Sequence, residues 1–217
     1  MIITYFGKQF FKIQQGDLVL AINPISKDSK SGIKVSRFGA NIALSTTNHP
    51  DYNGLENVSH GETVPFEISG PGDYEVQGIF IKGVLSETQI DGLPTGQAGK
   101  KFINTIYSFS VDNISICFFG PINGDKISTE SREKIDPPDI VFVPISGDDT
   151  LSSAEAYKLA TSFDAKIIIP MDFENGDKNI KAFLKEGGQE GEKAIDKLTI
   201  KQKELLDKEG EIIVLQY

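Results

Sequence analysis

Residues 140–170 read IVFVPISGDDTLSSAEAYKLATSFDAKIIIP, and this stretch decides the fold class. Its two ends, Ile140–Ile145 and Lys166–Pro170, are near-continuous apolar runs, which are typical of strands buried on both faces. Between them a capping box, S-x-x-E, begins a predicted helix over Ser152–Phe163 whose apolar residues share one face. A strand–helix–strand unit requires a parallel pair of strands with a right-handed crossover. The sequence therefore predicts a sheet with peripheral helices.

Outward from this unit, short apolar runs between turn residues predict further strands. They are Ile2–Phe6, Phe10–Ile13, Leu18–Ile22, Asn41–Ser45, Val64–Ile68, Tyr74–Val76, Ile79–Leu85, Thr105–Val111 and Ile114–Phe119. Towards the C-terminus, Lys178–Leu184 predicts a helix and Glu211–Leu215 a strand, whereas Leu198–Asp207 fits either a helix or a strand followed by a turn. The Gly- and Thr-rich stretch Ser86–Lys101 predicts a mobile loop.

The composition narrows the class of protein. A net charge of −9 without a basic cluster disfavours nucleic acid as a partner. No apolar run approaches the roughly 18 residues of a membrane helix, so we expect no membrane partner, and no signal peptide is recognised. The single cysteine, Cys117, cannot form an internal disulfide. We therefore expect a cytoplasmic protein in which this thiol is an inert core residue.

The most informative polar stretch, Thr46–Gly54, directly follows a predicted buried strand and reads TTNHPDYNG. His49 and Asp51 are two residues apart in it, and both are competent ligands for zinc or manganese. Two ligands are too few for a metal centre. The alternative is that both side chains stabilise a turn through hydrogen bonds to the backbone.

Several framework segments resemble one protein family. They are ITYFGKQFFKI (3–13), GPGDYEVQGIFIKG (70–83), VFVPISG (141–147) and KIIIPMDF (166–173). Together they are similar to the metallo-β-lactamase superfamily, in the branch of the ascorbate-6-phosphate lactonase-like metal-dependent hydrolases. Members of that branch open with a similar ITYLGHS-F-I strand pair. The resemblance implies an α+β fold, the αββα sandwich of the metallo-β-lactamase type, as a single domain over residues 1–217.

The metal motif of that family is degenerate here. The resemblance places its T-H-x-H-x-D-H motif on Thr46–Tyr52, which keeps His49 and Asp51 but has Thr47 and Tyr52 where the family has histidines. The next family histidine falls on or near Ser86. The remaining family positions, the bridging aspartate, the final histidine and the acidic residue of the "DP" step, fall on Pro121, Asp172 and Asn23 respectively.

These replacements decide the functional prediction. Proline has no donor atom in its side chain, so Pro121 cannot bridge two metals. We expect a pseudoenzyme, a hydrolase-like scaffold without dinuclear zinc or another cofactor that binds an unidentified small molecule or forms a homo-oligomer. The alternative is a hydrolase of lactones, esters or phosphodiesters with one zinc or manganese ion on His49, Asp51 and Asp172. In that case Asp51 would be catalytic, orienting the metal-bound water or accepting its proton.

Two structural expectations follow from the resemblance. The positions that correspond to family ligands should gather at one edge of the sandwich, within about 15 Å. Asp51 and Asp172 should then be neighbouring negative charges without a metal, which raises one carboxyl pKa or recruits a cation or a water network. On the residues alone, Asp172 also fits a cap for the helix near Lys178 or a partner for strand-end amides.

Overall fold

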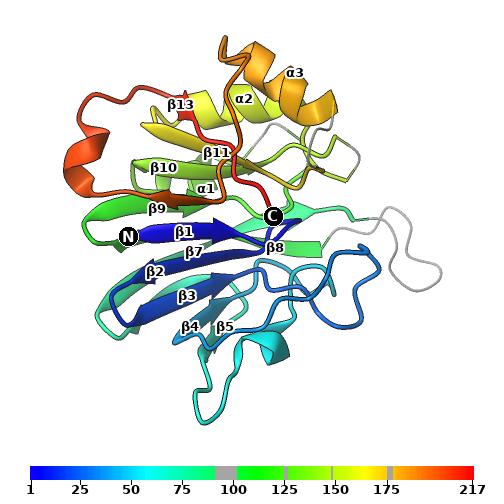
Figure 1. The fold of residues 1–217 in the computed structure, drawn as a ribbon, viewed down its shortest axis with the longest axis vertical. Coiled ribbons are helices and arrows are strands. Elements are labelled where there is room, and N and C mark those ends of the chain that lie inside the picture. Colours follow the sequence, from blue (N-terminus) through cyan, green and yellow to red (C-terminus); the bar gives the residue numbers. More distant parts are fainter. Residues whose placement is uncertain (91–101, 125–126, 148, 175–177) are drawn as a thin grey trace.

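Two mixed β-sheets packed face to face form the protein, in a computed structural model that describes residues 1–90, 102–124, 127–147, 149–174 and 178–217 (Figure 1). The six-stranded sheet has the order β12-β1-β2-β3-β4-β5, and the seven-stranded sheet has the order β13-β11-β10-β9-β8-β7-β6. The predicted α+β sandwich is confirmed.

The element bounds are as follows. The six-stranded sheet contains β1 (Ile2–Tyr5), β2 (Phe11–Gln15), β3 (Leu18–Ile22), β4 (Ile42–Leu44), β5 (Phe66–Ile68) and β12 (Lys197–Thr199). The seven-stranded sheet contains β6 (Gly72–Val76), β7 (Ile79–Thr88), β8 (Phe102–Val111), β9 (Ile114–Phe118), β10 (Ile140–Pro144), β11 (Ile167–Met171) and β13 (Glu211–Ile212). The helices are α1 (Thr129–Glu133), α2 (Ser153–Thr161) and α3 (Lys178–Glu186), with 3-10 turns η1 (Leu55–Val58) and η2 (Gln202–Leu205).

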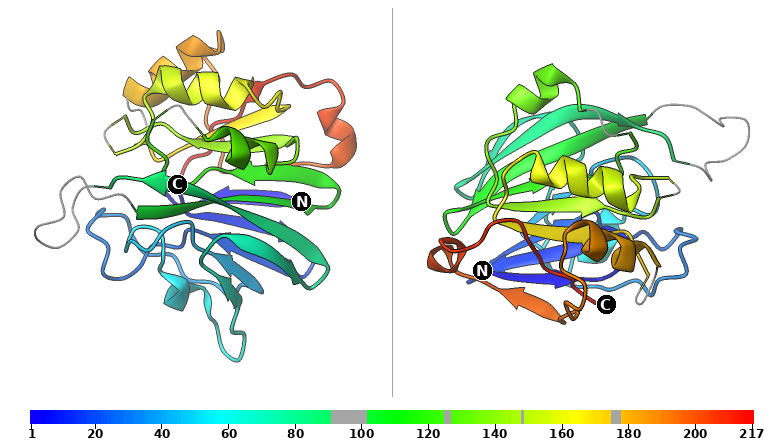
Figure 2. Two further views of the ribbon diagram at one scale, coloured as in Figure 1. Left: turned by 180° about the vertical axis from the view of Figure 1, so that it is seen from behind. Right: turned by 90° about the horizontal axis from the view of Figure 1, so that it is seen from above.

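The strand–helix–strand unit forms as its sequence predicts. Strands β10 and β11 are parallel and fully buried, and α2 crosses between them. The capping box is present: the Ser152 hydroxyl accepts from the Glu155 amide, and the Glu155 carboxylate accepts from the Ser152 amide. Helix α3 lies beside α2 on the outer face of the seven-stranded sheet (Figures 1 and 2). Among the described residues, no helix is long and apolar enough to cross a membrane.

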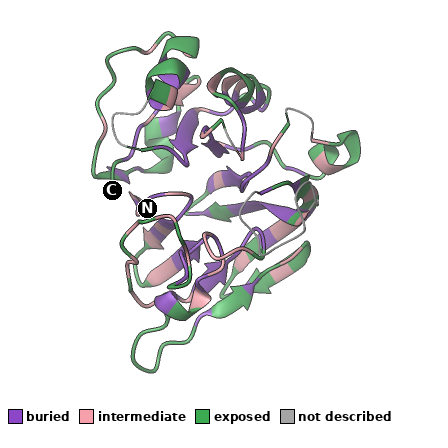
Figure 3. Ribbon diagram, turned by 90° about the vertical axis from the view of Figure 1, so that its right-hand side faces the viewer, coloured by how far each residue is buried: buried purple, intermediate pink, exposed green. Residues whose placement is uncertain are grey.

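Aromatic rings hold the two sheets together at the centre of the core. Phe11 of β2 lies edge-on to Phe118 of β9 and Phe142 of β10, with ring centroids 6.0 Å and 4.8 Å away. All three rings are inaccessible to solvent, and Figure 3 shows buried residues concentrated between the sheets. Each such ring contributes several kcal/mol, since truncating a buried Phe costs about 3–5 kcal/mol. The sandwich is therefore a rigid support for the loops at its edges.

An irregular layer covers the outer face of the six-stranded sheet. Phe10 stacks on Phe38, with centroids 5.6 Å apart, and both pack against Phe6. These rings belong to a second, smaller hydrophobic cluster that also contains Ile25 and Val58. The polar-looking segment that follows β3 is thus anchored by a few apolar side chains.

Several predicted element boundaries differ from the observed ones. The predicted loop Ser86–Lys101 is wrong at its start, because β7 continues to Thr88 and pairs there with β8. Polar residues fit this strand end because they alternate, with Glu87 exposed and Thr88 buried under a hydrogen bond to the Pro121 carbonyl. The rest of that loop, 91–101, lies outside the described residues. Of the two readings of Leu198–Asp207, the strand with a following turn is correct, and β13 is shorter than predicted. Helix α1 and turn η1 were not predicted.

Candidate functional site

Strand ends from both sheets meet at one edge of the sandwich and present a group of polar side chains. Lys8 and Gln9 follow β1, Asn23 follows β3, and Asp172 follows β11. The segment after β4 adds Thr46 and Tyr52. We call these six residues, Lys8, Gln9, Asn23, Thr46, Tyr52 and Asp172, the edge network.

Asp172 is the centre of the edge network. Its Oδ1 lies 3.2 Å from the Lys8 ammonium. Its Oδ2 accepts hydrogen bonds from Gln9 Nε2 at 3.1 Å and from the Tyr52 hydroxyl at 3.3 Å. Asp172 is 4% exposed and Tyr52 1% exposed. Both carboxylate oxygens are therefore engaged by groups of the protein itself.

The network continues from Gln9 into the six-stranded sheet. Asn23 Nδ2 donates to Gln9 Oε1 at 3.3 Å and to Thr46 Oγ1 at 2.9 Å. The Thr46 amide in turn donates to Asn23 Oδ1 at 2.8 Å. Because Gln9, Asn23 and Thr46 are buried, these hydrogen bonds are shielded from water and join the ends of β1, β3 and β4.

Backbone strain concentrates at the same place. Lys8, Asn23 and Asp172 have φ angles of 51°, 49° and 62°, in the left-handed region that non-glycine residues rarely adopt. The Asp172 amide donates to the Lys8 carbonyl at 2.7 Å, and the Tyr5 hydroxyl donates to the same carbonyl at 2.7 Å. A left-handed residue costs about 1–2 kcal/mol, and such residues persist where their surroundings fix them.

The charge states of the network are set by burial and by Asp172. Burial alone lowers the pKa of Lys8, but the charge of Asp172 and its hydrogen bond outweigh it, so this pKa is raised. Burial, and then the charge of Asp172, raise the pKa of Tyr52 well above its usual value. Lys8 therefore carries a charged ammonium group, and Tyr52 is a neutral phenol whose hydroxyl donates a hydrogen bond.

His49 and Asp51 form a separate, neighbouring pair. The Asp51 amide donates to His49 Nδ1 at 3.2 Å, and the Ser29 hydroxyl donates to the Asp51 carboxylate. Burial lowers the pKa of His49, which favours the neutral ring. A neutral imidazole that accepts at Nδ1 carries its proton on Nε2. In this tautomer neither ring nitrogen has a lone pair available for a metal.

The other predicted positions form hydrogen bonds within the protein. The Thr47 carbonyl accepts from the Ser45 hydroxyl at 3.1 Å and from the His49 amide at 3.0 Å. Ser86 accepts from Asn104 Nδ2 at 2.7 Å. The Pro121 carbonyl accepts from the Thr88 hydroxyl. These positions are thus parts of the fold's own hydrogen bonding.

A tight contact joins the Ser86 and Pro121 region to the edge network. A Cβ placed on Gly120 would lie 2.3 Å from Asn104 Oδ1 and 2.9 Å from Thr46 Oγ1. Asn104 also donates to Ser86 and, at 2.8 Å, to the Phe119 carbonyl. This contact links Ser86 through Asn104 and Gly120 to Thr46 of the edge network.

The residues present do not fit the dinuclear zinc centre that the fold implies. Among the described residues, no group of three or more His, Cys, Asp or Glu side chains is placed to hold a metal ion. The predicted ligands His49, Asp51 and Asp172 do not form such a group. Asp172 is occupied by Lys8 and Tyr52, while His49 accepts a backbone hydrogen bond.

Sequence reasoning missed Lys8, Gln9 and Thr46 as members of this site. A signal for Lys8 was present, because Gly7-Lys8-Gln9 stands where the similar family segment reads G-H-S. A cation does lie beside Asp172, and it is the ammonium of this lysine. Asp172 contacts Tyr52 and Gln9.

Comparison with known proteins assigns the family. The family model described as the beta-lactamase superfamily domain matches residues 2–172, and the chain belongs to this family. No protein of curated function matches the chain.

Solved structures show the same fold. A candidate zinc-dependent hydrolase of the metallo-β-lactamase superfamily from Thermotoga maritima is 23% identical, with a TM-score of 0.73 over 99% of this chain and 97% of that chain. A candidate metal-dependent hydrolase from Parabacteroides distasonis is 16% identical, with a TM-score of 0.63 over 99% and 93%. A metallo hydrolase from Ignicoccus hospitalis is 15% identical, with a TM-score of 0.57 over 92% and 99%. The fold is that of the metallo-β-lactamases, and these three structural neighbours are described as metal-dependent hydrolases or candidates for that class.

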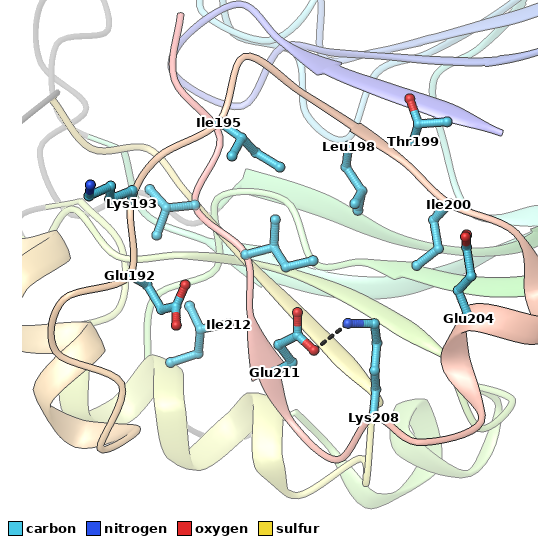
Figure 4. A pocket seen from close by; sticks show the side chains of 12 residues that line it. Glu192, Lys193, Ile195, Leu198, Thr199, Ile200, Glu204, Lys208, Glu211 and Ile212 are labelled. Atoms are coloured by element: carbon cyan, nitrogen blue, oxygen red, sulfur yellow. Dashed lines mark hydrogen bonds and ion pairs between the residues drawn. The ribbon is translucent and has the colours of Figure 1, made fainter.

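A cavity of about 630 Å³ lies in the C-terminal segment, beyond the part of the chain that the family model matches (Figure 4). Leu198, Ile200 and Ile212 are among the apolar side chains that line it. An ion pair between Lys208 and Glu211 lies at its wall. We call it the C-terminal cavity.

Proposed function

We propose that this chain is a metallo-β-lactamase-fold protein that does not carry a dinuclear zinc hydrolase centre and acts as a binding or self-associating protein. The proposal includes a degenerate metal motif and a place in the branch that resembles ascorbate-6-phosphate lactonases. It treats residues 1–217 as one domain.

The edge network is the observation that carries this proposal. Where the family resemblance places its ligands, the Asp172 carboxylate is neutralised by Lys8 and bonded by Tyr52 and Gln9. A zinc hydrolase needs about three protein ligands and an open coordination position for water. Two engaged carboxylate oxygens, a neutral phenol and a histidine that accepts at Nδ1 do not supply that set.

Two surfaces support binding rather than catalysis. The C-terminal cavity has a volume in the range of small-molecule sites, and its lining combines apolar side chains with charged ones. At the other end of the six-stranded sheet, Val64 and Phe66 are 74% and 53% exposed. Phe66 belongs to β5, an edge strand, and exposed edge strands are surfaces on which copies of a chain associate.

Metal content and activity, measured on one preparation, test the proposal. Protein purified without chelator should hold well under one equivalent of zinc or manganese, by elemental analysis. It should hydrolyse lactones, esters and phosphodiesters at background rates, with or without added metal. Light scattering coupled to size-exclusion chromatography then measures self-association.

The opposite result has a specific meaning. A stoichiometric metal that chelator removes, with metal-dependent hydrolysis that Asp51→Asn abolishes, overturns the proposal in favour of the mononuclear hydrolase. A matched control is Asp136→Asn, an exposed carboxylate remote from the edge network that should leave any such activity unchanged.

A further inference from the structure

The buried carboxylate of Asp172 requires a nearby positive charge and hydrogen-bond donors. A carboxylate that is 4% exposed loses most of its hydration, and a buried charge is tolerated when it is paired and fully hydrogen-bonded. In the metallo-β-lactamase fold implied by the resemblance, the corresponding strand end faces metal ions. The residues of this chain do not fit such a centre, so the positive charge must come from elsewhere.

We propose that the ammonium of Lys8 replaces the metal as a built-in cation, and that it ties the ends of β1 and β11 together so that this edge assembles without metal. The inference deepens the proposed function, on which it rests, because a metal-free edge needs its own source of positive charge. It assigns this role to Lys8, which lies in the turn between β1 and β2.

The geometry of the carboxylate supports this role. The ammonium approaches Oδ1 at 3.2 Å, while the two neutral donors, Tyr52 and Gln9, approach Oδ2. One cation and two neutral donors thus occupy three of the roughly four lone-pair sites of this carboxylate. The donors come from two segments, the turn after β1 and the segment after β4, so pairing Asp172 also fixes their relative positions.

Other negative charges also favour the ammonium form of Lys8. Asp51 and Asp149 also act on Lys8 and favour its charged form. The ammonium thus interacts favourably with the charges of three carboxylates, of which Asp172 is in direct contact with it. Its side chain is 30% exposed, so the carbon stem packs in the protein while the fold holds the charge near Asp172.

The backbone provides a second, independent tie. Lys8 and Asp172 both adopt left-handed φ angles, and the Asp172 amide donates to the Lys8 carbonyl. The two residues are thus joined through both main chain and side chains, although 164 positions separate them. A metal centre joins distant segments in the same manner, by gathering ligands from several loops onto one charge.

A double-mutant cycle tests whether charge, rather than packing, is responsible. Lys8→Met keeps the length of the side chain and removes the charge, and Asp172→Asn keeps the shape of the acceptor. Each single variant should lower the melting temperature by at least about 5 °C, because each leaves a buried group unpaired. Their combination should be no less stable than the worse single variant, and Lys8→Arg should recover most of the loss.

A matched control comes from the exposed pair Lys82–Asp136, whose ammonium and carboxylate lie 2.9 Å apart with side chains 36% and 71% exposed. Lys82→Met should shift the melting temperature by about 1 °C or less. If Lys8→Met does not fold, Asp172→Asn and Lys8→Arg still give the comparison between a lost and a retained charge.

The outcomes separate this inference from the proposed function. Additive losses in the cycle, or a Lys8→Met variant as stable as wild type, overturn the inference while the metal content of the wild type still decides the proposed function. A wild-type protein whose melting temperature falls when chelator is added overturns both. A wild type that is indifferent to chelator, with coupled losses at Lys8 and Asp172, supports both.

Discussion

The edge network and the C-terminal cavity differ in how closely their side chains pack against one another. At the edge network, strand ends converge and their polar side chains satisfy one another, so that Tyr52 and Asp172 are almost inaccessible to solvent. At the C-terminal cavity, β12 and β13 belong to different sheets, and both charged and apolar side chains line the space between them. This cavity lies beyond residue 172, where the match to the family model ends.

This difference follows from the chemistry of the two linings. A buried polar cluster is stable when every member has a partner, so the replacements at the edge must be mutually consistent, as Lys8, Asp172 and Tyr52 are. At the C-terminal cavity, exposed charged side chains are solvated by water, and the apolar side chains tolerate open volume at the cost of lost packing contacts. Substitutions should therefore lower the free energy of unfolding strongly at the edge network and weakly at the C-terminal cavity.

The largest loss should come from Gly120→Ala, at the contact between the edge network and Asn104. Gly120 has φ +69°, and the added Cβ would meet Asn104 Oδ1 at 2.3 Å. Asn104 is held by hydrogen bonds to Ser86 and Phe119, so it cannot easily move away. We expect a loss of about 3 kcal/mol or more in the free energy of unfolding, measured with urea.

The control for this variant is Gly78→Ala. Gly78 has φ +77°, but no atom lies within 4 Å of an added Cβ. This variant isolates the backbone cost, which we expect to be about 1 kcal/mol. Equal losses in the two variants would mean that the contact with Asn104 contributes nothing.

Much of the fold could be predicted because it depends on local pattern. The apolar runs of β10 and β11 and the capping box at Ser152 are properties of short segments, and they survive in the structure unchanged. The end of β7 was misjudged because its polar residues are held by pairing with β8, which no local pattern reveals.

The edge network could be predicted in part. Resemblance placed Tyr52 and Asp172 at one edge, but the pair between Lys8 and Asp172 depends on left-handed backbone at two positions far apart in the sequence. Neither residue type favours that conformation strongly enough to be recognised. The hydrogen bonds of Asn23 and Gln9 likewise depend on side-chain directions that only the assembled sheets define.

An intermediate effect should follow from Tyr52→Phe, which removes a donor from Asp172. At neutral pH we expect a loss of about 1–2 kcal/mol, measured by urea unfolding, because a buried charged acceptor loses one partner. Tyr157→Phe, whose ring packs edge-on to Phe183 on the helical layer, is the control and should change stability by less than about 0.5 kcal/mol.

The same variant predicts a change in pH dependence. The pKa of Tyr52 is raised in the folded protein, so its contribution is fully present below the unfolded value of about 10 and is lost as pH rises above it. Between pH 9 and 11 the wild type should lose more stability than Tyr52→Phe. If the stability of the wild type and of Tyr52→Phe fell equally with rising pH, the Tyr52 phenol would not be buried beside a charge.

A smaller effect should follow from Lys208→Met at the wall of the C-terminal cavity. Lys208 pairs with Glu211, but Glu211 is 43% exposed, so water solvates the carboxylate when the lysine is removed. We expect a change of about 0.5 kcal/mol or less in the free energy of unfolding. A loss as large as that of Lys8→Met would mean that the two regions do not differ in the way described above.

The smallest effect concerns Cys117, which lies in β9 and is inaccessible from either region. Burial raises the pKa of its thiol far above the usual range, so the reactive thiolate is absent from the folded protein. Labelling by an aromatic disulfide reagent should therefore follow unfolding of the seven-stranded sheet. In the Lys208→Met variant, Cys117 should be labelled at the wild-type rate. In the Lys8→Met variant, Cys117 should be labelled faster, in proportion to that variant's loss of stability. Rapid labelling of the native wild type would show instead that β9 is reached through a local opening of the folded protein.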